Sequence, residues 1–252
     1  MTKKEVLIRH LREEEAKDVT EMVRDNLWNV FYHETIKRSL NRFTLAFFLG
    51  LGVTSYLIFL FTGRSHETAM YFSSIVSCLS SLSLFLIERK ITLRLFNDSF
   101  ERDMKCVYEH YRDVGRAFLV AEVDGAIAGT VAIDTDDTLE YSKTGELRRM
   151  AVFPGYRGRS ISKLLLSEAE DFCMNQGYEK VNLSTSELQI PAIKLYTRSG
   201  YVETGRMLVK ILTFSIKMHG FQKQILRTAD SVVRCEDHIP NKLLRNTYNR
   251  GN

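Results

Sequence analysis

Two long uncharged runs lie next to each other in the first half of this 252-residue chain. The first covers residues 43–62 and the second residues 69–87, and only residues 63–68 separate them. As a helix, each run is long enough to cross the roughly 30 Å hydrocarbon core of a bilayer. The alternative is two buried core helices, but adjacent helices without a polar face are difficult to bury in a small soluble domain. The sequence therefore predicts a transmembrane helical hairpin over residues 43–87.

Small and hydroxylated residues recur along both runs. Gly50 and Gly52 lie in the first run, and Ser74, Ser77 and Ser81 share one helical face of the second. Small residues let two helices approach closely within lipid, and hydroxyl groups can bond across the interface or back to helix carbonyls. We therefore expect the two helices to pack along a seam of glycine and serine.

Basic residues flank the predicted hairpin on both sides. They are Lys37, Arg38 and Arg42 before it, and Arg89, Lys90 and Arg94 after it. The connector between the two runs contains one lysine or arginine, Arg64. Lysine and arginine are enriched on the cytoplasmic side of membrane proteins. We therefore expect both termini, and everything outside the hairpin, to face the cytosol.

A strand, a tight turn and a helix follow one another in the second half of the chain. Residues 146–152 form a strand-like run, and apolar residues recur at helical spacing over residues 160–176. The turn between them directs several backbone N–H groups toward one point, and the helix N-terminus adds roughly half a positive charge. Such a place binds phosphate. Because Arg157 and Arg159 flank it, the segment is a candidate site for a nucleotide-like cofactor.

This turn lacks the Gly-Lys-Ser/Thr ending of a Walker loop and the G-x-G-x-x-G pattern of dinucleotide-binding folds. It resembles instead the pyrophosphate loop of the GNAT acetyltransferase superfamily, Arg/Gln-x-x-Gly-x-Gly/Ala, often found within Val-x-Pro-x-x-Arg-Gly-x-Gly-Ile. The matching residues are Val152, Pro154, Arg157, Gly158 and Ile161. Ser160 and Ser162 stand where the family has glycine and a second small residue. Serine adds a side chain beside the phosphate, but its hydroxyl can itself donate a hydrogen bond.

A second segment resembles the same superfamily. Residues 192–201 match its Ala-x-x-Leu-Tyr-x-x-x-Gly-Phe/Tyr pattern, in which the tyrosine falls on Tyr196. The segment begins about 35 residues after the loop, which leaves room for one helix, one strand and a short connection. Two motifs in this order are more specific than either alone. On these two motifs the chain is identified as a member of the GNAT superfamily.

The other predicted elements follow the order of that superfamily. Strands are expected at residues 6–12, 117–123, 126–133 and 146–152, around Val181 and Leu183, and at 207–217, and helices at 13–28, 160–176 and from Pro191 to Gly200. Asp124-Gly125 is a strong hairpin signal between two of these strands. Residues expected to point inward from the first helix are Ala16, Val19, Met22 and Val23, and Leu208, Leu212, Phe214 and Ile216 are expected on one face of the last strand. The resemblance implies an α/β (α+β) GNAT fold, a mixed, mostly antiparallel sheet flanked by helices, with an inserted transmembrane helical hairpin.

A GNAT domain interrupted near its first helices by an apolar hairpin resembles the camello-type membrane N-acetyltransferases. Residues 146–152, Glu-Leu-Arg-Arg-Met-Ala-Val, look like the Glu-Leu-x-Arg-x-x-Val strand of that family. The resemblance implies an endoplasmic reticulum enzyme that acetylates a small-molecule amine, such as that of an amino acid or cysteine conjugate. The expected division is a first strand and helix at 1–36, the hairpin at 43–87, the main acetyltransferase domain at 98–218 and a basic tail at 219–252.

The superfamily resemblance also implies roles for individual residues in acetyl transfer from acetyl-CoA to a primary amine. Residues expected to bind the cofactor are Arg157, Gly158, Arg159, Ser160, Ile161 and Ser162 at its pyrophosphate, and Met150 and Val152, through their backbone, at its pantetheine arm. Glu146 would accept the amine proton through water, since most amines are protonated near neutral pH. Tyr196 would protonate the leaving thiolate, since a phenol pKa near 10 keeps it protonated beforehand.

Arg148 and Arg149 are neighbours in the predicted strand, so their side chains are expected on opposite faces of the sheet. One of them would face the substrate and pair with a carboxylate through the two-pronged geometry of arginine, which favours an amino-acid substrate. Each assigned residue also has a purely structural interpretation: the charged ones as solvated surface residues, and Tyr196, Met150 and Val152 as packing residues.

Composition narrows the function further. The net charge of +4 is too diffuse to indicate nucleic acid as a partner, and Cys78, Cys106, Cys173 and Cys235 have no metal or redox spacing, as is typical of free thiols in a reducing compartment. No metal cofactor is expected. Two alternatives stay open: a protein lysine or N-terminal acetyltransferase, which needs an open peptide groove, and a non-catalytic CoA-binding membrane protein, which Ser160 and Ser162 suggest. The basic tail could lie on the membrane or pack on the domain.

Overall fold

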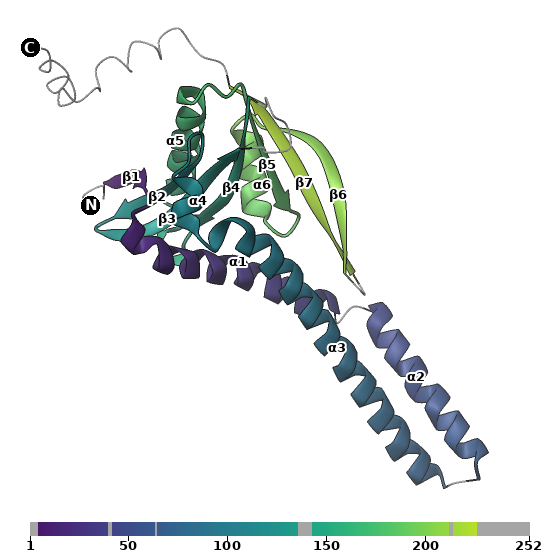
Figure 1. Ribbon diagram of the computed structural model, residues 1–252. Helices are drawn as coiled ribbons and strands as arrows, with labels where there is room; N and C mark the ends of the chain where they lie inside the picture. The colour runs from purple at the N-terminus through teal and green to yellow at the C-terminus, as the bar shows by residue number, and fades with distance from the viewer. Residues whose placement is uncertain (1–4, 40–41, 64, 136–142, 212–213, 226–252) are drawn as a thin grey trace, which may run out of the picture.

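The computed structural model describes residues 5–39, 42–63, 65–135, 143–211 and 214–225 (Figure 1). Seven strands form one sheet in the order β1-β2-β3-β4-β5-β7-β6. They are β1 (Val6–His10), β2 (Ala117–Val123), β3 (Ala126–Thr135), β4 (Thr144–Val152), β5 (Lys180–Ser186), β6 (Val202–Ile211) and β7 (Phe214–Gln224). Neighbouring strands are antiparallel except β4 and β5, which run parallel.

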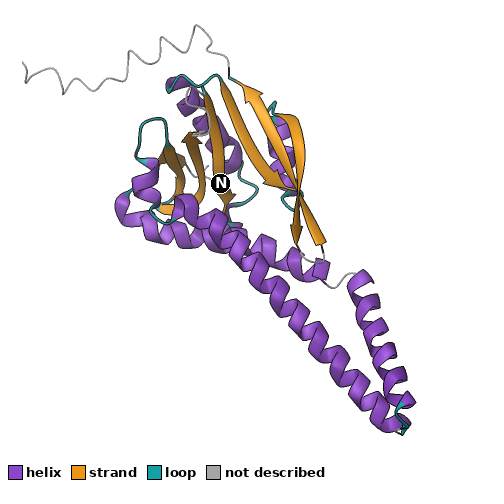
Figure 2. Cartoon of the chain, turned by 45° about the vertical axis from the view of Figure 1, so that its right-hand side comes forward, coloured by secondary structure: helices purple, strands orange, loops and turns teal. Residues whose placement is uncertain are grey.

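Helices cover both faces of this sheet (Figures 1 and 2). They are α1 (Ala16–Ser39), α2 (Arg42–Phe61), α3 (His66–Met104), α4 (Val107–Tyr111), α5 (Ile161–Asn175) and α6 (Ile190–Arg198), with 3₁₀ turns η1 (Glu13–Glu15) and η2 (Pro154–Tyr156). Helices α5 and α6 share a core on one face, and α1, α3 and α4 share a core on the other. The mixed sheet flanked by helices confirms the predicted fold class.

The centre of the sheet is buried on both sides because alternate residues of β2 enter different cores. Leu119 packs in the core that contains Leu165 of α5, and Phe118 packs in the core that contains Val19 of α1. Successive strand residues point to opposite faces of a sheet. This explains why β2 is apolar almost throughout instead of alternating with polar residues.

The Asp124-Gly125 turn joins β2 to β3, as its sequence predicts. Both residues have a positive φ, 53° for Asp124 and 78° for Gly125. Two positive φ values characterise the two-residue turn whose twist matches that of paired strands, and aspartate and glycine adopt them at the least cost. The turn sets the register in which Val123 pairs with Ala126.

Strands β4 and β5 pair over only part of their lengths. Their parallel register ends where Leu147 lies opposite Leu183, yet β4 continues to Val152 and β5 to Ser186. On its other side β5 stays paired with β7 as far as Ser186. The second half of β4 therefore has no strand partner on the β5 side, and its backbone groups there need another partner.

A bulge in β4 begins just beyond this point. Thr130 and Ala132 of β3 are two residues apart, whereas their partners on β4, Ala151 and Arg148, are three apart. Arg149 within this stretch has φ of 52°, and its carbonyl oxygen accepts a hydrogen bond of 2.8 Å from Thr130 Oγ1. An extra residue bends a strand and changes the direction of its side chains. The consequence for the two arginines is described with the site.

Helix α2 and the first part of α3 project from the sheet domain side by side (Figures 1 and 2). Ser73 Oγ donates to the carbonyl oxygen of Gly52, and Ser77 Oγ donates to a second α2 carbonyl at 3.0 Å. A Cβ added to Gly52 would lie 3.5 Å from Ser77 Oγ, an ordinary contact. The structure contains the predicted seam. Ser73 and Ser77 cross it, whereas Ser74 and Ser81 bond back to their own helix.

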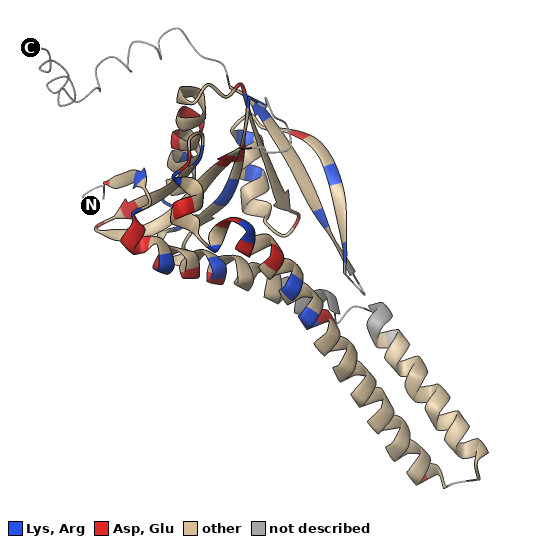
Figure 3. Ribbon diagram, in the orientation of Figure 1, with Lys and Arg blue, Asp and Glu red and all other residues tan. Residues whose placement is uncertain are grey.

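One helix of the described residues, α3, is long and apolar enough to cross a membrane, and none of its apolar window is buried. Helix α2 contributes a shorter apolar stretch, Phe47–Phe61. Exposed large apolar side chains, among them Leu49, Phe61 and Tyr71, cover both helices. Figure 3 shows that the projecting part has almost no charged residues, whereas the sheet domain has many.

Several elements extend beyond their expected limits. The helix expected at residues 13–28 begins with η1 and continues as α1 to Ser39. The second apolar run is the first half of α3, which continues without a break into the sheet domain. Val19 and Val23 are fully buried as predicted, but Met22 is 36% exposed and was wrongly assigned to the core.

The single strand expected over residues 207–217 is wrong. Strand β6 ends at Ile211 and β7 begins at Phe214, so the chain reverses there. The segment has none of the glycine, proline, asparagine or aspartate residues that usually mark a turn. Leu208 is exposed and Ile216 is buried, while Leu212 lies outside the described residues. The first residues of the expected tail, up to Gln224, belong to β7; residues 226–252 lie outside the described part.

Gly129→Ala should destabilise the protein and disturb the end of β4. A Cβ at position 129 would lie 2.6 Å from the carbonyl oxygen of Ala151 and 3.2 Å from Leu165 Cδ1. A backbone oxygen this close must move, and overpacking of this kind costs about 1–3 kcal/mol. Thermal unfolding of detergent-purified protein measures the loss. Gly205→Ala is the matched control, since a Cβ there meets nothing within 4 Å; equal melting temperatures for the two variants would contradict the expectation.

Candidate active site

Strand β4 ends in a tight turn that leads into α5. Phe153 N donates to the carbonyl oxygen of Ala128 at 2.9 Å, so the turn stays attached to β3. Pro154–Tyr156 then form η2, and Gly158 has φ of 78°. This left-handed conformation costs glycine nothing, because glycine has no Cβ. The chain thereby reverses within a few residues and begins α5 close to the end of β4.

The start of α5 presents unpaired backbone donors. Lys163 N and Leu164 N donate to the carbonyl oxygen of Ser160 at 3.0 and 3.3 Å. In the described part of the chain, the N–H groups of residues 158–162 donate to no backbone oxygen. The first N–H groups of a helix lack an internal partner, and the helix dipole makes this end positive. The turn therefore has the geometry that can bind an anion.

Ser160 occupies the N-cap of α5 in a left-handed conformation, with φ of 60° and ψ of 13°. A residue other than glycine pays roughly 1–2 kcal/mol for this conformation. The serine thus keeps the backbone shape that glycine adopts freely at this position of the family motif. The departure from the motif therefore costs energy at the turn.

Both arginines of the turn contact neighbouring groups. Arg157 Nε donates to the carbonyl oxygen of Val152 at 3.1 Å, and its Nη2 donates to Asn26 Oδ1 of α1 at 3.0 Å. The Arg159 guanidinium carbon lies 5.6 Å from the centre of the Tyr156 ring. Arg157 therefore ties the turn to the end of β4 and to α1, and both charges stay beside the unpaired N–H groups.

A pocket of about 290 Å³ opens on the sheet where β4 and β5 begin to separate. It is lined by Thr144, Glu146, Asn182, Leu183, Ser184, Thr204, Gly220 and Phe221, from β4, β5, β6 and β7. Its one ionisable side chain is Glu146, and four of the other lining side chains carry a hydroxyl or an amide. The pocket is therefore small, polar and acidic. Glu146, predicted as a catalytic residue, lies in its wall.

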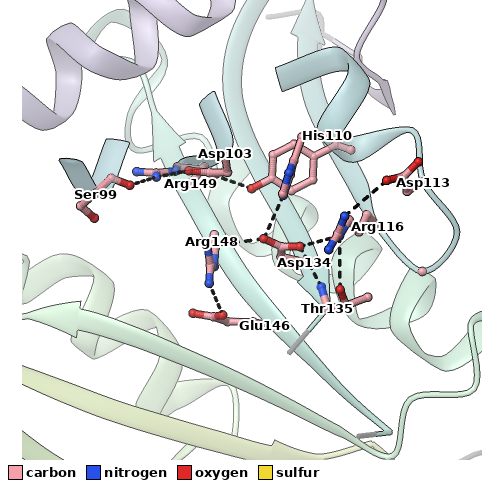
Figure 4. A network of polar contacts seen from close by, with 12 residues as sticks. Ser99, Asp103, His110, Asp113, Arg116, Asp134, Thr135, Glu146, Arg148 and Arg149 are labelled. Atoms are coloured by element: carbon pink, nitrogen blue, oxygen red, sulfur yellow. Dashed lines mark hydrogen bonds and ion pairs between the residues drawn. The ribbon is translucent and has the colours of Figure 1, made fainter. Parts of the chain in front are cut away.

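Glu146 does not stand alone at the pocket wall (Figure 4). Arg148 Nη2 donates to Glu146 Oε2 at 2.5 Å, and Arg148 Nη1 lies 3.4 Å from Asp134 Oδ2. Asp134 is almost fully buried. Arg148 thus links the pocket carboxylate to a buried carboxylate behind it, and its charge compensates part of theirs.

Asp134 is bound from three further directions. His110 Nε2 lies 3.1 Å from Asp134 Oδ2, and Arg116 Nε lies 2.8 Å from Asp134 Oδ1 (Figure 4). The backbone N–H of Thr135 also donates to Oδ1, at 2.9 Å. A buried carboxylate is stable only when it is paired and hydrogen-bonded, and these donors satisfy both of its oxygens. Asp134 therefore holds Arg148 in one position.

Arg149 forms a separate ion pair. Its Nε donates to Asp103 Oδ2 at 2.9 Å, its Nη2 pairs with Asp103 Oδ1, and Nη2 also donates to the carbonyl oxygen of Ser99 at 2.9 Å. The Tyr111 hydroxyl donates to Asp103 Oδ2 at 2.5 Å. Burial alone would raise the pKa of Asp103, but the hydrogen bonds and charge of Arg149 and the bond from Tyr111 outweigh it and lower the pKa. The pair fastens the last turn of α3 to the bulge of β4.

The expectation that Arg148 and Arg149 point to opposite faces is wrong. Arg149 pairs with Asp103 of α3, and Arg148 joins a network that includes His110 of α4, so both lie on the face that α3 and α4 cover (Figure 4). The bulge at Arg149 supplies one extra residue and so breaks the alternation of side chains.

Tyr196 is buried in the core on the α5 and α6 side of the sheet. Its ring lies 5.7 Å from the ring of Tyr201 and 6.3 Å from that of Phe221, which lines the pocket. Burial raises the pKa of its hydroxyl, so the phenol stays protonated at neutral pH. Met150 and Val152 are half-buried against the core under α5, and both lie in the part of β4 that has no β5 partner.

Sequence reasoning missed the residues behind the pocket. Asp134 follows an apolar strand directly, which is a detectable signal for a buried acid. Asp103 and Asn182 have no local signal, because their relation to β4 arises only when α3 and β5 pack beside it. In the described residues no group of three or more histidine, cysteine, aspartate or glutamate side chains could hold a metal ion.

Comparisons with known proteins agree with this geometry. Residues 83–201 match the model of the acetyltransferase (GNAT) family. The human protein N-acetyltransferase 8B is 30% identical over 139 residues, which cover 54% of this chain and 61% of that protein. N-acetylaspartate synthetase of Xenopus tropicalis is 30% identical over 169 residues, which cover 61% of each chain. The mouse protein named "Probable N-acetyltransferase family 8 member 5" is 30% identical over 170 residues, which cover 64% of this chain and 75% of that protein.

Solved structures share the fold. An acetyltransferase of the GNAT family from Staphylococcus aureus Mu50 has a TM-score of 0.52 and 16% identity, and the match covers 88% of this chain and all of that one. The structure of yncA from Salmonella typhimurium, with its cofactor acetyl-CoA, has a TM-score of 0.51 and 14% identity, covering 90% of this chain and 97% of that one. This chain belongs to the GNAT acetyltransferase family. Within that family its relatives at about 30% identity are the camello-type proteins, the N-acetyltransferase 8 proteins and the N-acetylaspartate synthetases.

Arg149→Met should destabilise the fold by about 3–5 kcal/mol, because it leaves the buried Asp103 carboxylate without its partner. Adding Asp103→Asn should recover much of the loss, since the buried charge is then gone. Arg206→Met is the control: its pair with Glu203 is exposed, and such pairs contribute less than about 1 kcal/mol. Thermal unfolding in detergent compares the three variants, and an Arg149→Met variant no less stable than Arg206→Met would refute the role given to the pair.

Proposed function

We propose that this protein is a membrane-anchored N-acetyltransferase that transfers an acetyl group from acetyl-CoA to the primary amine of a small molecule. One observation carries the proposal: β4 links an anion-binding turn at one end to an acidic pocket at the other, along a stretch that β5 leaves unpaired. Six residues separate Glu146 from Val152, or roughly 20 Å of extended strand. An extended cofactor can lie along this edge with its phosphates at the turn.

The residues of the turn fit acetyl-CoA. The N–H groups of residues 158–162 are unpaired with the backbone of the described chain and lie at the positive end of α5. Arg157 and Arg159 supply charge beside them. The unpaired edge of β4, with Met150 and Val152, supplies backbone groups for the pantetheine arm. Bound acetyl-CoA supplies an activated thioester carbonyl; the protein positions it and moves protons.

Glu146 is the proposed proton acceptor for the amine. The reaction forms a bond between the amine nitrogen and the acetyl carbon and breaks the bond from that carbon to sulfur. The attacking amine must lose its protons, and a carboxylate in the pocket wall can accept one directly or through water. Arg148 holds this carboxylate in place at 2.5 Å, and Asp134 in turn holds Arg148.

Tyr196 is the proposed proton donor to the departing thiolate. It is protonated because burial raises the pKa of its hydroxyl. It lies on α6, and its ring is 6.3 Å from the ring of Phe221, a residue that lines the pocket. The purely structural alternative is that Tyr196 only packs between Tyr201 and Phe221, and kinetics separate the two.

The pocket favours a small amine over a peptide. Its volume of about 290 Å³ is at the lower end of the range for small-molecule sites. Arg148 is bound to Glu146 of the pocket wall, and among the described residues its buried Nε has no hydrogen-bond partner; we assign this guanidinium to the carboxylate of an amino acid or cysteine conjugate. We assign Arg149 to fastening α3 instead, because both of its prongs already bind Asp103.

The helical hairpin is the proposed membrane anchor. Its exposed apolar side chains, including Leu49, Phe61 and Tyr71, would be costly in water. Helix α2 has 20 residues, about 30 Å at 1.5 Å per residue, which matches the hydrocarbon core of a bilayer. The basic flanks on both sides favour a cytosolic domain and cytosolic termini. The relatives named N-acetyltransferase 8 motivate the endoplasmic reticulum as the membrane.

A non-catalytic CoA-binding protein is the second candidate, because Ser160 is held in a conformation that favours glycine. The two candidates differ in one result. Acetyl-CoA consumption by detergent-purified protein, measured over amino acids, cysteine conjugates, polyamines and peptides, should identify an accepted small amine. Binding of acetyl-CoA without transfer to any of them would support the second candidate.

Ser160→Asp should weaken acetyl-CoA binding about tenfold or more, since a charge placed against the phosphates repels them. Ser160→Gly should bind as well as the natural protein or better, because it removes the strain of the left-handed serine. Calorimetric titration of the full chain in detergent gives the dissociation constants. Ser167→Asp on the exposed side of α5 is the control, and an affinity loss as large in this variant would disprove a phosphate site at the turn.

Glu146→Gln and Tyr196→Phe should each lower the turnover number about a hundredfold or more while acetyl-CoA affinity stays unchanged. A group that moves a proton acts on turnover, whereas a packing residue acts first on stability. Glu168→Gln on α5 and Tyr108→Phe on α4 are matched controls. An unchanged turnover number in Tyr196→Phe would mean that this tyrosine only packs. An unchanged turnover number in Glu146→Gln would mean that another group accepts the amine proton.

Sealed microsomes test the anchor and its orientation. The protein should resist carbonate extraction, and protease added outside should remove a tag from either terminus, because both flanks of the hairpin are basic. Protection of the C-terminal tag alone would indicate one span and a luminal domain. Release by carbonate would mean that neither helix is embedded.

A further inference from the structure

The paired strands β6 and β7 extend beyond the rest of the sheet toward the base of the helical hairpin. In Figures 1 and 2 their joined ends lie beside the place where α1 ends and α2 begins. Helix α3 also contacts β6. If α2 and α3 are embedded as proposed, the base of the hairpin is the membrane surface, so this end of the two strands lies at the same level.

The described residues near this end are apolar and basic. Met207 and Leu208 of β6 are 64% and 54% exposed. Lys210 on β6 and Lys217 on β7 are exposed beside them, and Lys217 lies directly opposite Leu208 in the strand register. Residues 204–219 contain three basic residues and no acidic one.

This composition suits the headgroup region of a bilayer. Exposed methionine and leucine bury apolar surface at the boundary of the acyl chains, and lysine extends its ammonium group to the headgroups, where each basic residue near an anionic surface contributes about 1 kcal/mol. Exposure to water would not stabilise these apolar side chains.

We propose that the exposed residues near the end of the β6–β7 hairpin, Met207, Leu208, Lys210 and Lys217, form a second membrane contact in the headgroup region beside α2 and α3. The proposal rests on the membrane anchor proposed above. The partner at this contact is the lipid surface, because the base of the helical hairpin formed by α2 and α3 lies next to these strands.

The contact bears on the active site. Thr204 of β6 and Gly220 of β7 line the amine pocket, and Thr204 is four residues from Leu208, or roughly 13 Å along the strand. A lipid contact at the end of the β6–β7 hairpin therefore fixes the side of the pocket formed by β6 and β7 relative to β4 and Glu146. The membrane thus holds the two sides of the pocket from two points, α3 and β6–β7.

Tryptophan quenching by brominated lipid tests the contact in the full chain. The chain has one tryptophan, Trp28, so Trp28→Phe provides the background, and single tryptophans are placed as Leu208→Trp, Val202→Trp and Val53→Trp. Val202 is the matched control, because it is 69% exposed on the same strand but roughly 20 Å from Leu208 along the strand, toward the end away from the helical hairpin. Val53 lies in the middle of α2 and reports the anchor.

The proteins are reconstituted in phosphatidylcholine–phosphatidylserine nanodiscs with bromine at either shallow or deep acyl positions. Leu208→Trp should lose fluorescence mainly to shallow bromine, since interfacial segments reach only ~5–10 Å below the headgroups. Val53→Trp should be quenched by deep bromine and Val202→Trp by neither. Circular dichroism checks the fold. If Trp28→Phe fails to fold, the same substitutions are made with Trp28 present and its constant signal is subtracted.

The outcomes separate this inference from the proposed anchor. Quenching at position 53 but none at position 208 would overturn the second contact and leave the anchor intact. No quenching at position 53 would refute the anchor, and the inference with it. Protection of position 208 from aqueous iodide without quenching by either bromine would also overturn it, in favour of a contact with a second copy of the chain.

Discussion

The separation of β4 from β5 is the constraint on which the rest of the site depends. Pairing stops after Leu147 and Leu183, and β4 runs on alone to the turn before α5. A strand edge inside a sheet must find other partners for its N–H and C=O groups, and an extended cofactor is one such partner. The pocket at Glu146 lies just before this separation, so the two halves of the proposed reaction share one strand.

The bulge in β4 joins this site to the long apolar helix α3. Without the extra residue, Arg149 would face the core under α5, where a guanidinium would have no partner. With it, Arg149 reaches Asp103 at the end of α3, while Arg148 remains between Glu146 and Asp134. Two buried carboxylates thus bind two adjacent arginines. Arg149 stabilises the fold, and Arg148 lies beside the pocket. The long helix α3, which projects from the sheet domain, is therefore attached to this domain next to the candidate site.

Much of this protein could be predicted from local patterns. Positive φ at Asp124 and Gly125, the apolar spacing in α5 and the proline that opens α6 are short-range properties, so sequence periodicity and turn chemistry reveal them. The chain reversal between β6 and β7 was missed, because its segment has strand-forming residues throughout and none of the usual turn residues. There the pairing of two long strands overrides the weak local signal.

The sequence by itself determined the family, the tight turn before α5 and the two apolar helices, because each depends on residues close together in the chain. The tertiary structure alone decided which groups meet. Asp103 is 46 residues from Arg149, and Arg148 reaches Asp134 across a sheet whose register contains a bulge. Alternation of side chains holds only in a regular strand, and nothing in the local sequence marks the irregularity. Contacts between distant residues depend on packing, and packing is a property of the whole chain.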